Sequence, residues 1–191
     1  MPENEYYYIA DSKNCPYGEK SDDELMRIVR NNVDELKEWG AKIIVIACNT
    51  ATTKCIEKLR ELYPGLKFVG TEPAIKLATK SDAKEILVMA TPGTVHSERL
   101  MSLLKENQKE GQKVELLACS GLADAIEEEK EIDKVLASLL EGVRQPDLVV
   151  LGCTHYSLIK EKIQNYFPRA TLIDGNEGVA RRVAELVKNP L

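Results

Sequence analysis

The sequence lacks any run of the roughly 20 apolar residues that a membrane-spanning helix needs. It also lacks an excess of positive charge, because the net charge of its 191 residues is -5, which argues against a nucleic-acid partner. The opening residues, MPENEYYY, show neither the basic nor the apolar region of a signal peptide. We therefore expect a cytoplasmic protein that has no contact with a membrane.

Cysteines are few and are not arranged as a disulfide framework. The five cysteines, Cys15, Cys48, Cys55, Cys119 and Cys153, are odd in number and irregularly spaced. In a reducing compartment they should be free thiols.

Several motifs of known chemistry are also absent. There is no C-x-x-C pair for redox exchange or a zinc ribbon, so no metal site is expected. Neither glycine-rich nucleotide loop, G-x-G-x-x-G or G-x-x-x-x-G-K-[ST], occurs. A phosphatase loop of the C-x5-R type is excluded because Lys54 and Ile159 occupy the arginine positions.

Short apolar runs alternate with amphipathic segments along the chain. The runs IIVIA and LVVLG are continuously apolar, as is typical of parallel strands that helices cover on both faces. This alternation predicts the α/β class. We expect strands over 6–11, 41–47, 67–71, 85–91, 113–119, 148–152 and 171–174, and helices over 22–39, 51–63, 74–80, 94–109, 122–141, 157–166 and 177–188.

A weak internal similarity suggests two related lobes. VIACNTATT, residues 45–53, is similar to VLGCTHYSL, residues 150–158, since each is a strand followed by a cysteine and a threonine-bearing turn. We expect two similar lobes with mostly parallel sheets flanked by helices. The predicted first lobe is 1–72 plus 172–191, and the second is 73–171. Sites in open α/β sheets lie at the carboxyl ends of strands, so the cleft between the lobes is the expected active site.

Cys48 and Cys153 are the leading candidates for chemistry. A cysteine that follows an apolar strand is often a small buried residue. Here polar residues follow directly: Asn49 and Thr50 after the first cysteine, and Thr154 after the second. The N-terminus of a following helix binds anions and lowers thiol pKa values. The backbone amides and these three side chains could hold a substrate carboxylate.

Of the two histidines, one is a candidate for acid/base work. His155 lies two residues after Cys153, where it could assist the thiol, although a lone histidine is often structural. His96 lies at a helix start and is interpreted as structural. A cysteine hydrolase would use one nucleophile and a histidine, and would leave the second strand-end cysteine unexplained.

Two turns could line the cleft. NCPYGEKSDD contains Tyr17 and Gly18, whose backbone could reach the substrate, and an ordinary turn is the alternative. ATPGT contains Thr91 and Thr94, which offer hydroxyls and free amides at a strand end. Helix capping by Thr94 is the alternative there, and both roles can hold together.

The segments ACNTAT, LGCTHYSLI, CPYG and VGTEPAI, in the chain from about residue 5 to residue 188, resemble the glutamate branch of the aspartate/glutamate racemase family. The resemblance implies two α/β lobes around glutamate and no cofactor. It implies that one thiolate removes the α-proton while the opposite thiol returns a proton to the other face. The D-glutamate formed in this way would supply peptidoglycan synthesis.

The resemblance also assigns roles to residues of this sequence. Cys48 and Cys153 become the proton acceptor and donor pair, with His155 assisting Cys153. Glu127 loosely matches a family acid that supports the site, and a solvated helix end is its alternative. The resemblance implies that Tyr17, Gly18, Asn49, Thr50 and Thr154 contact the substrate. Thr94, in the ATPGT turn, is a further predicted contact.

The sequence departs from the family at its beginning. In the family that the sequence resembles, the chain opens with a strand that ends in Asp-Ser-Gly. Asp11-Ser12 does not correspond to that motif, because its place just before CPYG assigns it to a later loop. Three explanations for the missing strand are open: the start of the gene was assigned too late, the protein was shortened, or the chain is a natural remnant. The absent strand should leave apolar surface and backbone groups unpaired in the first sheet, and racemase activity should be low or absent. A non-catalytic amino-acid-binding remnant and an aspartate-type racemase are the other functions considered, and a homodimer is a plausible assembly.

Overall fold

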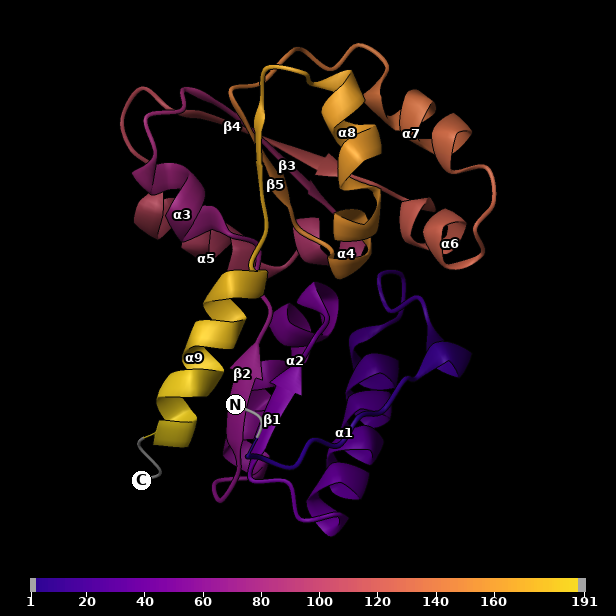
Figure 1. The fold of residues 1–191 in the computed structure, drawn as a ribbon, viewed down its shortest axis with the longest axis vertical. Coiled ribbons are helices and arrows are strands. Elements are labelled where there is room, and N and C mark those ends of the chain that lie inside the picture. Colours follow the sequence, from indigo (N-terminus) through magenta and orange to yellow (C-terminus); the bar gives the residue numbers. More distant parts are fainter. Residues whose placement is uncertain (1–2, 189–191) are drawn as a thin grey trace.

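The structure is a computed structural model that describes residues 3–188. Its elements form two groups, with β3, β4 and β5 in the upper one and β1, β2, α1, α2 and α9 in the lower one (Figure 1). In chain order the elements are η1 (Ser12–Asn14), α1 (Asp22–Glu38), β1 (Ile43–Ile46), α2 (Asn49–Leu62), β2 (Lys67–Gly70), α3 (Ile75–Lys80), β3 (Glu85–Ala90), α4 (Pro92–Val95), α5 (Glu98–Asn107), β4 (Lys113–Ala118), α6 (Leu122–Glu127), α7 (Ile132–Leu140), β5 (Leu148–Leu151), η2 (Thr154–Ile159), α8 (Lys160–Tyr166), β6 (Thr171–Ile173) and α9 (Asn176–Lys188). No helix within the described range combines the length and the apolar character needed to cross a bilayer.

The larger sheet has the strand order β4-β3-β5-β6, and all of its pairings are parallel. Alternate residues of β3 enter two different cores. Ile86 and Val88 pack in the cluster that contains residues of α3 and α5. Leu87 and Met89 pack in the cluster that contains residues of α6, α7 and α8. Helices therefore cover both faces, which confirms the α/β class with parallel sheets.

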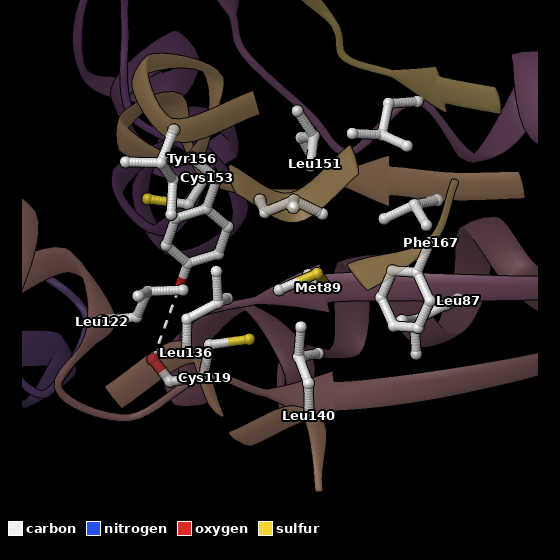
Figure 2. Packing of buried hydrophobic residues seen from close by; sticks show 14 of the residues in the cluster. Leu87, Met89, Cys119, Leu122, Leu136, Leu140, Leu151, Cys153, Tyr156 and Phe167 are labelled. Atoms are coloured by element: carbon white, nitrogen blue, oxygen red, sulfur yellow. Dashed lines mark hydrogen bonds between the residues drawn. The ribbon is translucent and has the colours of Figure 1, made fainter. Parts of the chain in front are cut away.

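The second of these cores lies directly behind one of the candidate cysteines. Figure 2 shows Cys153 and Tyr156 packed among Leu136, Met89 and neighbouring side chains. The Tyr156 hydroxyl donates a hydrogen bond of 3.3 Å to the Cys119 carbonyl. Because this hydroxyl is satisfied inside the core, the segment that follows β5 is held in a fixed position.

The smaller sheet consists of the parallel strands β1 and β2. Ile44 and Ile46 point into a core shared with α1 and α2. On the other face Val45 stays 41% exposed, although α9 contacts both strands. Within residues 3–188, β1 pairs with no strand except β2. Among the described residues, one edge of β1 is therefore unpaired.

Four predicted elements differ from the structure. In the helix predicted over 157–166, the first residues belong to the 3-10 helix η2, and the α-helix α8 begins at Lys160. Residues 6–11, predicted as a strand, have no regular structure, because no strand lies beside them to complete a ladder. The helix predicted over 94–109 is two helices, α4 and α5, separated by the Ser97 cap of α5. The helix predicted over 122–141 is interrupted between α6 and α7, where Glu129 and Glu131 have φ of 54° and 50°.

The two sheets lie on either side of the break predicted at residues 72 and 73. The second predicted boundary, at residue 172, falls inside β6, which pairs with β5 in the larger sheet. The chain returns after this strand, because α9 contacts β1 and β2. We retain the two-lobe division as a proposal, with the return moved to Asp174.

The packing of the larger lobe predicts a large effect from one core substitution. Leu136 is 0% exposed in α7, whereas Leu158 of η2 is 77% exposed. Leu136→Ala should lower the free energy of unfolding by about 2–5 kcal/mol, because it leaves a cavity in the core. Leu158→Ala, the matched control, should change it by less than about 0.5 kcal/mol. Urea denaturation measures both, and equal effects would contradict the assigned core.

Candidate active site

Cys48 lies where β1 passes into α2. It precedes the first helical residue in an extended conformation, with φ -145° and ψ 124°. Its carbonyl accepts a hydrogen bond of 2.9 Å from the Thr52 amide, and the Thr52 hydroxyl donates one of 3.2 Å to the Ile46 carbonyl. The helix therefore begins immediately after the strand, and the thiol is placed at its N-terminus.

Cys153 occupies the corresponding place after β5. Its φ of -141° and ψ of 137° are close to those of Cys48, and it directly precedes η2. The Cys153 carbonyl accepts a 3.1 Å hydrogen bond from the Tyr156 amide. The similar backbone at the two positions agrees with the internal similarity seen in the sequence.

Both cysteines line one cavity of about 1200 Å³, which they enter from different sheets. The thiols are near enough for the charge of Cys48 to affect the pKa of Cys153. Of the ten predicted site residues, all but Thr94 line this cavity: Tyr17, Gly18, Cys48, Asn49, Thr50, Glu127, Cys153, Thr154 and His155.

Burial dominates the acidity of both thiols. It raises the pKa of Cys153 to about 12, although the backbone N–H groups of His155 and Tyr156 act in the opposite direction. It also raises the pKa of Cys48, against the N–H groups of Ala51 and Thr50. The helix N-termini thus act in the predicted direction, but the loss of solvation outweighs them.

His155 connects Cys153 to Glu127. The Cys153 sulfur lies 3.7 Å from His155 Nδ1, and His155 Nε2 lies 2.9 Å from a carboxylate oxygen of Glu127. A carboxylate on one ring nitrogen fixes the orientation of an imidazole. Glu127, the last residue of α6, therefore contacts the site through His155, even though its side chain is 45% exposed.

Three threonine hydroxyls join the lobes beside the cavity. Thr50 Oγ1 lies 2.8 Å from Thr91 Oγ1 and 3.3 Å from Thr94 Oγ1. Thr94 is fully buried and does not line the cavity, so its predicted role as a substrate contact is replaced by one of supporting Thr50. The capping of α4 comes instead from Thr91, which accepts a hydrogen bond from the Thr94 amide. His96 is exposed at the end of α4, as its structural interpretation allows.

Close backbone contact joins the same two turns. The Gly93 amide donates a 3.1 Å hydrogen bond to the Gly18 carbonyl. A Cβ on Gly93 would lie 2.6 Å from that carbonyl oxygen, and one on Gly18 would lie 2.9 Å from Thr91 Cβ. Glycine is therefore required at both positions for the lobes to approach this closely.

Thr154 makes a second connection, because its hydroxyl donates a hydrogen bond of 3.4 Å to the Ala47 carbonyl in the first lobe. Tyr17 is held from its own side, where its hydroxyl donates a 2.6 Å hydrogen bond to Asp11. Burial and this carboxylate raise the pKa of Tyr17, so the hydroxyl stays protonated. The contact predicted between Tyr17 and the substrate would therefore involve the backbone of Tyr17 and not its hydroxyl.

Asn49 stands out among the polar residues of the cavity. It is 4% exposed, and its Oδ1 is the buried side-chain polar atom of residues 3–188 that has no hydrogen-bond partner. An unpaired buried carbonyl costs about 1–3 kcal/mol. A donor group on a bound molecule would remove this cost, which makes Asn49 a strong candidate for a ligand contact.

Sequence reasoning missed one cavity residue, Cys15, and did not choose Thr91 over Thr94 within the ATPGT turn. Thr91, considered as a turn hydroxyl, lines the cavity in place of Thr94. Cys15, interpreted as one of several free thiols, also lines it. Burial and the charges of Glu127 and other groups raise the pKa of Cys15 to about 11. No local pattern around Cys15 distinguished it, because its neighbours in the site come from distant segments.

The comparisons with known proteins agree with this arrangement. The sequence profile described as Asp/Glu/Hydantoin racemase matches residues 1–183. The glutamate racemase of Clostridium botulinum is 38% identical over 191 residues, which cover 96% of this chain and 74% of that relative. The glutamate racemase of Campylobacter concisus is 39% identical over 193 residues, which cover 96% and 73%.

A solved structure also superposes on the chain. Escherichia coli glutamate racemase, crystallised with L-glutamate and the activator UDP-MurNAc-ala, has a TM-score of 0.81 and 32% identity. The match covers 94% of this chain and 71% of that one.

The raised pKa of Cys153 makes the free energy of unfolding depend on pH. The pKa changes from an ordinary value of 9.0 to about 12 in the folded protein. The folded state therefore holds the proton more tightly, and this stabilisation is complete below pH 9 and is lost as pH rises toward 12. The loss can reach about 1.4 kcal/mol per pH unit.

Cys153→Ser removes this titration, so its free energy of unfolding should fall less steeply above pH 9 than that of the wild-type protein. Urea denaturation on both sides of that pH measures the difference. Leu158→Ala, which changes no ionisable group, should keep the wild-type slope. Parallel curves for wild type and Cys153→Ser would contradict the raised pKa.

Proposed function

We propose that this chain, which belongs to the Asp/Glu/Hydantoin racemase family, interconverts L-glutamate and D-glutamate by moving the α-proton between two thiols. The family consists of isomerases, and the relatives described above are glutamate racemases. The observation that carries the mechanism is that Cys48 and Cys153, from two different lobes, line one cavity.

Inversion of a stereocentre explains why two similar groups are needed. One group removes the proton from one face of the α-carbon, and the other delivers a proton to the opposite face. In the proposal Cys48 and Cys153 take these roles in turn, and their exchange of roles allows both directions. Because the same chemistry serves each direction, no cofactor is invoked.

The α-proton of an amino acid is only weakly acidic, so the site must stabilise the negative charge that develops when this proton is removed. Polar groups that are already oriented stabilise the developing charge more effectively than water does. Asn49 Oδ1, buried and unpaired, can accept a hydrogen bond from the substrate ammonium. The amides at the start of α2 and the Thr50 hydroxyl can hold a carboxylate.

The buried thiols need a positive charge nearby in order to ionise. The substrate ammonium supplies one, because an opposite charge within about 4–6 Å favours the charged form of an acid. On the other wall His155 can take or return the proton of Cys153, from which it is 3.7 Å away. Glu127, at 2.9 Å from the same ring, orients the imidazole for this transfer.

In this proposal the product, D-glutamate, supplies peptidoglycan synthesis, and so cell-wall formation and cell shape, in the cytoplasm. The five cysteines of the chain are free, which suits a reducing compartment. A homodimer stays a prediction.

Hydrogen exchange at the α-carbon tests the mechanism. In D2O the wild-type protein should introduce deuterium into both enantiomers of glutamate, although at the low rate that the sequence predicts. Cys48→Ser and Cys153→Ser should each lower racemisation by about 10²–10⁴-fold, because serine is a poor base at neutral pH. Each should retain exchange from one enantiomer, and the two variants should prefer opposite enantiomers.

Cys55→Ser is the control, because Cys55, a residue of α2, is buried in the core of the smaller lobe and does not line the cavity. It should keep the exchange pattern of the wild-type protein. Glutamate binding without any exchange would favour the non-catalytic alternative. Loss of exchange from the same enantiomer in both cysteine variants would exclude two bases on opposite faces.

A further inference from the structure

Three potential metal ligands meet at the entrance to the cavity. Donor atoms of Cys15, Glu127 and His155 all lie within 4.8 Å of one another. Among the described residues, no other group of three or more His, Cys, Asp or Glu side chains brings its ligand atoms this close together. In Figure 1 the turn that carries Cys15, before α1, lies below α6, which ends at Glu127.

The three donors are chemically suited to a zinc-like cation. Thiolate, imidazole and carboxylate are the ligand types that bind Zn²⁺, usually in tetrahedral geometry with bond lengths of about 2.0–2.3 Å. Such bond lengths place neighbouring ligand atoms about 3.5 Å apart. His155 and Glu127 are already 2.9 Å apart, so a small rotation of the side chains would complete the arrangement.

The surroundings also favour a cation. Carboxylates of Glu127, Asp124 and Asp11 act electrostatically on the Cys15 thiol, so a divalent ion would enter a region of negative charge. Cys15 is partly exposed and Glu127 is exposed, which leaves a path for the ion and room for a water as the fourth ligand.

We propose that Cys15, Glu127 and His155 form an inhibitory binding site for a zinc-class divalent cation, which joins the two lobes across the entrance to the active site. Binding releases the thiol proton of Cys15 to solvent and forms a bond from the sulfur to the metal. It also engages His155, which contacts Cys153 at 3.7 Å. The inhibition rests on the proposed function, whereas the binding site does not.

No metal site was expected from the sequence, since it contains no C-x-x-C pair. The three ligands lie at positions 15, 127 and 155 and form no short motif. The fold creates the cluster. Cys15 comes from the first lobe, whereas Glu127 and His155 come from the second. A metal held by all three would consequently oppose the separation of the lobes.

Cobalt(II) is a spectroscopic probe for this site in the full chain. Thiolate coordination gives a charge-transfer band in the near ultraviolet, which does not depend on enzymatic activity. The wild-type protein should bind one Co²⁺ with this band, and Zn²⁺ should displace it. Cys15→Ser should lose the band, and Glu127→Gln should weaken binding by about 10–100-fold. Cys55→Ser, the matched control, should behave as the wild type.

The alternative location for the bound Co²⁺ is between the catalytic thiols of Cys48 and Cys153. A band that persists in Cys15→Ser but disappears in Cys48→Ser or Cys153→Ser would overturn the proposal, as would the absence of any band in the folded wild-type protein. Circular dichroism verifies that each variant is folded. Zn²⁺ should also slow α-proton exchange, and relative to its own metal-free rate Cys15→Ser should need at least about tenfold more Zn²⁺ for half-inhibition.

Discussion

The contact between the two lobes at Thr50, Thr91 and Gly18 determines where every other group of the site can lie. A hydroxyl pair 2.8 Å apart and a backbone hydrogen bond of 3.1 Å from Gly93 to Gly18 hold the strand ends of the two sheets together. Cys48 is two residues before Thr50, and Thr91 directly follows β3, which pairs with the strand that leads to Cys153. The positions of the two thiols therefore follow from this contact.

The contact also determines the electrostatics of the cavity. By excluding water it raises the pKa of both strand-end thiols, and it buries the Asn49 carbonyl without a partner. These are unfavourable terms for the protein alone. A small molecule with an ammonium group and a carboxylate compensates both, since it supplies a positive charge to the thiols and a donor to Asn49. The site is thus suited to an amino acid.

Much of the fold could be predicted from local pattern. The continuous apolar run of β5 and the cap and periodicity of α1 reflect burial that the sequence itself records. The strand predicted at 6–11 was wrong because a strand also needs a partner, which pattern alone does not supply. The break between α6 and α7 depends on positive φ at two glutamates, residues that usually continue a helix.

The candidate site was predictable where its residues adjoin the cysteines, and less so elsewhere. Asn49, Thr50 and His155 follow the thiols in sequence, so their places were evident. The buried place of Thr94 beside Thr50 and the place of Cys15 beside Glu127 were not predictable, because both arise only where distant segments meet.

The central claim is that one amino acid fits between the thiols of Cys48 and Cys153. A crystal structure of the protein with D-glutamate tests it most directly. The account predicts that the α-carbon lies between the two sulfurs, with the ammonium group at Asn49 Oδ1. Glutamate bound with both sulfurs on the same side of the α-carbon, or bound in a different cavity, would contradict it.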